Sequence, residues 1–380
     1  MADQTDQPEN YSLDMVGCYQ PVLKVFGLGG GGCNAIERMM SLGMKGVDFI
    51  AANTDRQALK NNPAPTRVLL GPNSAKGFGA GGDPRRGREA GEESRKEIAE
   101  ALAGADMVFL TAGMGGGTGT GSIPIVAEIA RSQGAVVIAI VTMPFAFEMG
   151  VRQRNATEGI SRLRKHTHTL VSIPNDRLLF VAPRDLPMEM AFSLADDVLR
   201  QAVQGIAELI TEPGLINVDF AHIRRLISLG GGALLAIGQG EGEDKAHKAL
   251  EQALHHPLLD TVYLANAAGV IANFSGGQDL TLLEVQEALM NLQRKTGQDT
   301  EIVLGVINDD RMEGKAQVIL MVTGLGAPTL EEAMSGVTRQ PTSMASTVIE
   351  QEVQHDKESM VVSGRSIERN LPPFFRYRDR

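Results

Sequence analysis

The chain has 380 residues, of which 43% are hydrophobic and 22% charged, and 36 basic against 46 acidic side chains give a formal net charge of −10. This composition excludes a wholly disordered chain and a protein with many membrane spans, and two cysteines exclude a small disulfide-built fold. The acidic balance argues against broad binding to the phosphate backbone of nucleic acids. We expect a cytosolic globular protein of two or three domains, with no signal peptide and no inserted membrane segment.

The first 20 residues are polar, and we expect them to be flexible. From residue 21 to 185, short apolar runs alternate with helical patterns, which predicts a Rossmann-like α/β domain with a parallel sheet between two layers of helices. The expected strands are Leu23–Phe26, Phe49–Ala52, Met107–Thr111, Ala135–Thr142 and Thr169–Ile173. The expected helices are Cys33–Leu42, Pro84–Ala103, Ile123–Ser132 and Val151–Lys165.

A long central helix is predicted over residues 186–211, because apolar residues recur there at spacings of three and four until Pro213 and Gly214 end the pattern. Residues 212–328 predict a C-terminal α+β domain. Its expected helices are Ile223–Leu229, Asp244–Leu254 and Leu280–Lys295, and its expected strands are Gly269–Phe274, Glu301–Asn308 and Gln317–Thr323. We expect hairpin-like pairing of the last strands. Residues 329–380 predict a flexible linker and a short C-terminal peptide.

Two glycine-rich loops each lie between an expected strand and an expected helix. The first, Gly27–Gly32, fits the spacing G-x-G-x-x-G, in which glycines let backbone N–H groups approach a phosphate at a helix N-terminus. A tight strand–helix turn without a ligand is the alternative interpretation. The second loop, Gly113–Gly121, has six glycines in nine residues. Because neither loop contains lysine and a dinucleotide site needs only one loop, the pair indicates a nucleotide with several phosphates.

The segment GGGTGTG at residues 115–121 resembles the signature of the tubulin/FtsZ superfamily. The stretch from about residue 23 to 325 is similar to bacterial FtsZ without large gaps. Other matching segments are NTDRQAL (53–59), KGFGAGGDPRRGREA (76–90), PFAFE (144–148), SIPNDRLL (172–179) and QGIAELITEPGLINVDFA (204–221). The resemblance implies a GTP-binding domain, a central helix and a C-terminal domain.

The resemblance also implies which residues bind GTP or GDP. The implied phosphate contacts are Gly30, Gly31, Gly32, Cys33 and Asn34 in the first loop and Gly116, Gly117, Thr118, Gly119 and Thr120 in the second. Residues 79–83 resemble the segment that senses the γ-phosphate, and Glu148 and Arg152 match the ribose pair. Asn175 and Asp196 match the base-reading positions, and Phe192 matches the residue that stacks on the base.

Each of these side chains also has an ordinary structural interpretation. Glu148 and Arg152, four residues apart, would otherwise be taken as a surface ion pair. Phe192 would be taken as core packing and Asp196 as part of a solvated helix face. If Asp196 reads the base, its carboxylate accepts hydrogen bonds from guanine N1–H and the exocyclic amine, a donor pattern that adenine lacks.

The segment after the central helix departs from the family pattern. Relatives have N-x-D-x-x-D, which completes the nucleotide site of the next subunit, whereas this chain has Asn217, Asp219 and His222. Histidine is mostly neutral at pH 7, so the local charge falls from about −2 to about −1. His222 either acts as a general base for water or marks a subunit that hydrolyses GTP slowly. We favour slow hydrolysis.

The resemblance implies a GTPase, forming GDP and phosphate, that assembles head-to-tail filaments at the mid-cell division ring of bacteria. Mg²⁺ is expected on phosphate oxygens, without a metal site of the protein's own. One alternative is a paralogue that binds GTP and copolymerises with or regulates another subunit, and a remote one is a Rossmann-type NAD oxidoreductase. Residues Leu371–Arg376 loosely resemble the peptide that docks on membrane-tethering division proteins, with an ordinary disordered terminus as the alternative.

Overall fold

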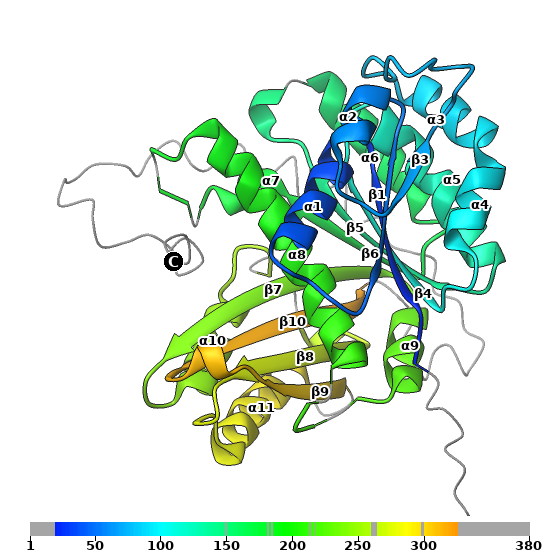
Figure 1. Cartoon of the computed structure of the whole chain (residues 1–380). Helices are drawn as coiled ribbons and strands as arrows, with labels where there is room; N and C mark the ends of the chain where they lie inside the picture. Colours follow the sequence, from blue (N-terminus) through cyan, green and yellow to red (C-terminus); the bar gives the residue numbers. More distant parts are fainter. Residues whose placement is uncertain are drawn as a thin grey trace, which may run out of the picture.

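A computed structural model, drawn in Figure 1, describes residues 20–325 except 149, 181, 184, 213, 217, 260–263 and 298–299. The predictions for the first 19 residues, Asn217, the linker and Leu371–Arg376 lie outside the described residues. The fold class is confirmed, since a mostly parallel N-terminal sheet is followed by a long helix and a second sheet region. Among the described helices, none combines the length and the apolar character needed to cross a membrane.

The first region begins with the strands and helices that carry the glycine loops. Its elements are β1 (Leu23–Leu28), α1 (Gly29–Ser41), β2 (Asp48–Asn53), α2 (Arg56–Asn61), β3 (Thr66–Leu69), α3 (Pro84–Glu93), α4 (Arg95–Leu102), β4 (Met107–Gly113), α5 (Thr118–Ser132), β5 (Val136–Met143), η1 (Ala146–Glu148), α6 (Gly150–Leu163), β6 (Thr169–Pro174) and α7 (Asn175–Leu178). The remaining elements are α8 (Met188–Thr211), α9 (Phe220–Ser228), β7 (Gly232–Glu241), α10 (Lys245–Leu254), η2 (Leu264–Asn266), β8 (Gly269–Gly276), α11 (Leu282–Thr296), β9 (Glu301–Asn308), η3 (Asp310–Met312) and β10 (Lys315–Leu325).

Within the described residues the strands form one ten-stranded sheet in the order β3-β2-β1-β4-β5-β6-β7-β10-β8-β9. The strands from β3 to β7 run parallel, and β6 joins β7 through the pairs Leu170–Gly232 and Val171–Ala233. The expected hairpin of the last strands is wrong. β9 pairs in parallel with β8, whereas β10 lies between β7 and β8 and is antiparallel to both.

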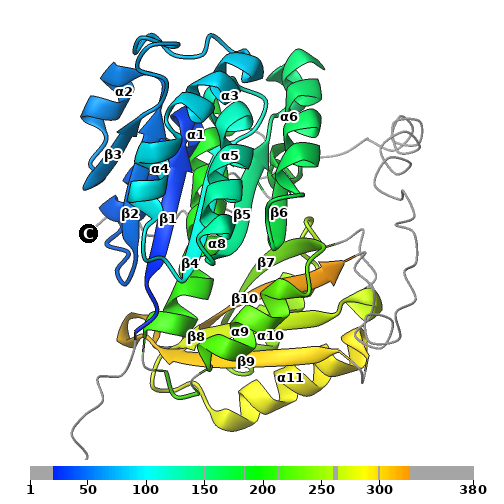
Figure 2. The same ribbon diagram turned by 90° about the vertical axis from the view of Figure 1, so that its right-hand side faces the viewer.

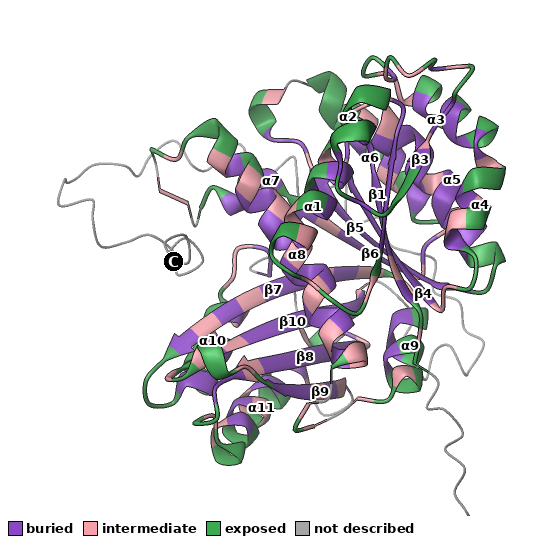
Figure 3. Ribbon diagram, in the orientation of Figure 1, coloured by how far each residue is buried: buried purple, intermediate pink, exposed green. Residues whose placement is uncertain are grey.

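Helices cover both faces of the parallel strands, as Figure 2 shows. Helices α1, α8 and α9 bury their apolar faces on one side, and α3, α4, α5 and α6 bury theirs on the other. A third core lies between α10, α11 and the C-terminal strands. The central strands are buried along their length (Figure 3), which explains their continuous apolar sequences. Helix α8 contacts both halves of the sheet, because its apolar stripe also packs on Ile319 and Met321 of β10.

Two local differences from the predictions have identifiable causes. The expected helix over residues 84–103 is divided at Ser94, whose hydroxyl accepts a hydrogen bond from Gly71 N at 3.0 Å. Strand β7 was not predicted, because its glycines weaken the strand pattern. The packing of α10 requires them, since a Cβ at Gly238 or at Gly240 would lie 2.0 Å from a carbonyl oxygen of that helix.

Candidate nucleotide site

The two glycine loops lie side by side at the carboxyl ends of β1 and β4, and each opens a helix. α1 begins within the first loop, where Gly29 has a φ of +67°, and α5 begins at Thr118. A Cβ at Gly29 would lie 2.9 Å from Gly119 N, and one at Gly31 would lie 3.0 Å from Gly113 N. The loops are therefore packed backbone against backbone, which only glycine permits.

Some glycines of these loops face open space instead. A Cβ at Gly30 in the first loop, or at Gly116 in the second, would meet no atom within 4 Å. Gly32, by contrast, is fixed by packing, because its Cβ would lie 2.4 Å from Thr111 O. Open glycines at two helix N-termini leave room for phosphate oxygens beside backbone N–H groups. A polyphosphate fits this cradle.

The threonines of the second loop are held by hydrogen bonds within the protein. The hydroxyls of Thr118 and Thr54 are 2.6 Å apart, and Thr54 is fully buried after β2. The buried Thr120 hydroxyl accepts a hydrogen bond from Gly115 N at 2.8 Å. Both side chains therefore shape the loop. Thr54 is a residue that sequence reasoning missed, although its segment, NTDRQAL, carried part of the family resemblance.

Cys33 and Asn34 differ in their surroundings. The Cys33 thiol is buried against Ala52 O at 3.7 Å, and burial raises its pKa to about 12. It stays protonated and packs α1 against β2, so any phosphate contact at this position would have to come from its backbone. Asn34 is exposed on the first turns of α1.

The implied base-reading residues lie on two helices that contact each other, Asn175 on α7 and Asp196 on α8. Asn175 is 4% exposed, and its Oδ1 atom has no hydrogen-bond partner among the described residues. Burial raises the pKa of Asp196 to about 7, opposed by the Arg38 guanidinium and reinforced by the neighbouring Asp197 carboxylate. A buried polar atom without a partner costs free energy. A guanine edge, which offers donors and an acceptor, would satisfy these groups.

Phe192 belongs to a cluster of three aromatic rings instead of a sealed core. It is 39% exposed and lies edge-on to Phe145 and Phe147, with ring centroids 5.4 and 6.4 Å away. Phe145 and Phe147 stack at 5.1 Å. The exposed part of this cluster offers an apolar surface for a flat ring.

Glu148 and Arg152 form an ion pair, as both interpretations of their spacing require. Glu148 is largely buried and also accepts a hydrogen bond from Phe145 N at 2.9 Å, whereas the Arg152 side chain is 58% exposed. The pair joins the end of η1 to the first turn of α6. It lies next to the second glycine loop, because a Cβ at Gly115 would lie 2.8 Å from Arg152 O.

The segment with Asp219 and His222 lies at the opposite edge of the same strands. Asp219 caps α9 by accepting a hydrogen bond from Ala221 N at 2.9 Å, and His222 is exposed in the first turn. Helix α9 is fixed to the first residue of β6, where the Thr169 hydroxyl donates to Ile227 O at 3.0 Å. Six residues of strand separate this edge from the loops, about 20 Å. Figure 1 shows α9 at the other end of the parallel strands from the start of α1, so one chain does not bring this segment to its own loops.

Residues 22–183 match the tubulin/FtsZ family GTPase domain, and residues 231–326 match the FtsZ family C-terminal domain. The chain is 44% identical over 322 residues to cell division protein FtsZ 1 of Archaeoglobus fulgidus, covering 85% of this chain and 87% of that protein. It is 46% identical over 309 residues to cell division protein FtsZ 1 of Thermococcus kodakarensis, covering 81% and 82%. The chain belongs to the FtsZ family.

Solved structures agree with this assignment. The empty FtsZ dimer of M. jannaschii has a TM-score of 0.78 and 43% identity to the chain, covering 82% of this chain and 90% of that one. CetZ2 of Haloferax volcanii, solved as a GTPγS-bound protofilament, has a TM-score of 0.68 at 21% identity and shares the fold. These FtsZ relatives are archaeal, so the expectation of a bacterial protein stays a prediction.

The next question is whether side chains of this FtsZ-family chain could hold a metal ion by themselves. No group of three or more histidine, cysteine, aspartate or glutamate side chains is arranged to hold a metal in the part of the chain that the structure describes. A cation on the phosphate oxygens is compatible with this set, because Mg²⁺ in nucleotide sites keeps several waters and few protein ligands.

Proposed function

We propose that this FtsZ-family chain binds GTP in the cradle of the two glycine loops and hydrolyses it to GDP and phosphate where a second copy supplies the α9 segment. The observation that carries the proposal is the position of Asp219 and His222, at the edge of the strands opposite the open glycines. Copies stacked head to tail bring these two edges together and extend without closing into a ring.

The residues of each edge have distinct tasks in this proposal. Backbone N–H groups near Gly30 and Gly116 bind the phosphates, Glu148 and Arg152 orient the ribose, and Asn175 and Asp196 read the guanine. Mg²⁺ on the phosphate oxygens would offset their negative charge. Asp219 of the adjoining copy orients the attacking water, a role that depends on position and electrostatics.

The rate of turnover depends on His222. With one carboxylate where relatives have two, the segment attracts cations more weakly, which favours a subunit that binds GTP and assembles but hydrolyses slowly. Such a subunit would copolymerise with or regulate a faster one. The family assignment leaves the NAD oxidoreductase interpretation without support, since it depended on the first loop alone.

GTP turnover measured against protein concentration tests the shared site. We expect negligible turnover at low concentration and a threshold above which turnover per subunit rises. Light scattering should increase with GTP and less with GDP or without nucleotide. Turnover per subunit that is independent of concentration would contradict a site completed by a second copy.

The cellular role extends the same proposal. The names of the archaeal relatives and the family match support a filament of cell division, located in the cytoplasm at the division site. Residues Leu371–Arg376 would bind membrane-tethering division proteins. Removing residues 371–380 should leave GTP-dependent scattering unchanged and abolish recruitment to the division site, which fluorescence microscopy of the tagged chain measures.

A further inference from the structure

The segment Gly79–Asp83 packs on the second glycine loop, because a Cβ at Gly117 would lie 2.8 Å from the Ala80 Cβ and 3.0 Å from Asp83 N. Gly79, Gly81 and Gly82 have φ values of +86°, +61° and +77°. A Cβ at Gly79 or Gly82 would meet no atom within 4 Å, so the backbone angles, and not close packing, require glycine at these two positions. The buried Ala80 anchors the middle of the segment, and hydrogen bonds hold its two ends, one of them from Gly79 N to Thr54 O at 3.1 Å.

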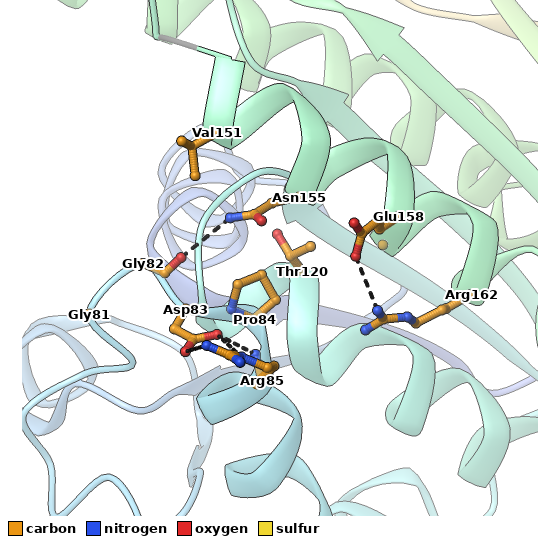
Figure 4. A pocket seen from close by; sticks show the side chains of 11 residues that line it. Gly81, Gly82, Asp83, Pro84, Arg85, Thr120, Val151, Asn155, Glu158 and Arg162 are labelled. Atoms are coloured by element: carbon orange, nitrogen blue, oxygen red, sulfur yellow. Dashed lines mark hydrogen bonds and ion pairs between the residues drawn. The ribbon is translucent and has the colours of Figure 1, made fainter. Parts of the chain in front are cut away.

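One such bond comes from the side chain of Asn155 on α6. Its Nδ2 atom lies 3.5 Å from Gly82 O and 3.3 Å from Gly115 O. A primary amide has two N–H donors, so it can donate one to each carbonyl. Figure 4 shows Asn155 extending from α6 toward Gly82. The amide therefore connects residues 79–83 with the second glycine loop, and all three segments are distant in sequence.

The Asn155 side chain reaches across a cavity of about 410 Å³ between α6 and this segment. Two arginines line the cavity, but Arg85 pairs with Asp83 at 3.1 Å and Arg162 pairs with Glu158 at 3.2 Å. Since both are neutralised, the cavity has little to attract a further anion. It does provide space into which residues 79–83 can move when the hydrogen bond from Asn155 to Gly82 O is broken.

Helix α6 also contacts the other end of the nucleotide site. Arg152, one turn before Asn155, packs its backbone on Gly115 and pairs with Glu148. Helix α6 thus carries Arg152 of the ribose pair and also contacts the second glycine loop and residues 79–83, the segment expected at the γ-phosphate. A residue that sets the spacing between those segments influences a ligand with a third phosphate more than one without it.

We propose that Asn155 is a positioning residue that selects GTP over GDP. Its amide holds the Gly82 carbonyl against the second loop, which keeps residues 79–83 within reach of the γ-phosphate. This inference rests on the proposed function, namely that the two loops bind GTP. GDP lacks the γ-phosphate that residues 79–83 are expected to contact, so loss of the amide should weaken GTP binding alone.

The test measures dissociation constants of GDP and of a slowly hydrolysed GTP analogue with the full chain, below the concentration at which it assembles. Asn155→Asp keeps the size of the side chain but places a carboxylate against two carbonyl oxygens. We expect it to weaken binding of the GTP analogue about two- to tenfold, the range for one or two lost hydrogen bonds, and to leave GDP affinity within about twofold. Asn155→Gln keeps the amide, has room in the cavity, and should restore most of the GTP affinity.

Gln153→Ala, on the exposed face of the same helix, is the matched control and should change neither affinity. Thermal unfolding of each variant is recorded, and Asn155→Ala replaces Asn155→Asp if the carboxylate lowers the Tm. Equal losses for both nucleotides would overturn the proposal, because they would indicate a merely structural role, and so would a Gln variant as weak as the Asp variant. A wild-type chain that binds neither nucleotide would instead refute the proposed function.

Discussion

The two edges of the parallel strands, the carboxyl edge with the glycine loops and the amino edge with α9, differ in how fully their polar groups are hydrogen-bonded within the chain. At the carboxyl edge, Gly30 and Gly116 face open space, the Oδ1 atom of Asn175 has no hydrogen-bond partner among the described residues, and the Asp196 carboxyl has a raised pKa. At the amino edge, Asp219 already caps a helix and His222 is exposed to solvent. The carboxyl edge has the incomplete hydrogen bonding that is typical of a ligand site. At the α9 edge, by contrast, the Asp219 carboxylate is already bonded within the chain as a helix cap. The difference supports the proposal above, in which a ligand completes the first edge and the second edge completes the site of another copy.

The largest expected effect follows from removing the carboxylate at the α9 edge. Asn is also a good helix N-cap, so Asp219→Asn should keep α9 folded while removing the negative charge. We expect GTP turnover to fall about 100-fold or more, with GTP affinity of the unassembled chain unchanged. Phosphate release and equilibrium binding measure the two quantities. Turnover within a few-fold of wild type would contradict the role of this edge.

Mixing two inactive variants tests directly whether the edges act in different copies. Gly116→Val fills the open space of the second loop, so that chain should bind nucleotide poorly but retain Asp219. Mixed with Asp219→Asn chains, it should restore turnover wherever an intact loop faces an intact α9 edge. A mixture no more active than its components would argue against head-to-tail sharing.

A smaller effect, in the opposite direction, is expected at His222. His222→Asp restores the second carboxylate of the family pattern, and the stronger attraction for cations should raise GTP turnover about tenfold. His222→Asn changes the side chain without adding charge, so it should leave turnover close to wild type. If histidine instead takes a proton from water, both variants lose activity, which steady-state phosphate release would reveal.

Sequence alone could predict the features that local rules determine. Asp83 and Pro84 mark the start of α3, where the Asp83 carboxylate accepts a hydrogen bond from Arg85 N at 2.9 Å. The buried strands and the long α8 follow from apolar pattern and length. The glycine clusters pointed to the loops, and the family resemblance supplied residues such as Asn175, whose side chain has no distinctive local pattern.

Features that depend on distant contacts could not be predicted in this way. Strand β10 inserts between β7 and β8, a choice of partners that no local pattern encodes. In the sequence, Asn155 is indistinguishable from the other polar residues of an exposed helix. Its hydrogen bonds to Gly82 and Gly115 span 73 and 40 residues of sequence. Thr54 likewise bonds to Thr118 across 64 residues. Such contacts arise only when the sheet has brought its strand ends together.

The raised pKa of Asp196 makes the carboxyl edge sensitive to pH. Its pKa of about 7 means that lowering the pH from 7.5 to 6 reduces the ionised fraction from about three quarters to about one tenth. Only the ionised form can accept both guanine donors, so GTP affinity should fall about eightfold over this range. Isothermal titration at a series of pH values measures it. Asp196→Asn should bind GTP weakly at every pH, and a wild-type affinity that does not change with pH would refute the base-reading role.

The smallest effects come from one substitution made at each edge. Thr54 and Thr169 are both buried, and each hydroxyl forms one hydrogen bond, to Thr118 at the carboxyl edge and to Ile227 O at the α9 edge. Thr→Val keeps the shape and removes about 1 kcal/mol of hydrogen bonding, about fivefold in an equilibrium constant. Thr54→Val should weaken GTP binding, because it loosens the second loop. Thr169→Val should leave GTP binding unchanged and lower turnover in the assembled state, because it loosens α9. Identical profiles for the two variants would mean that the edges do not have separate tasks.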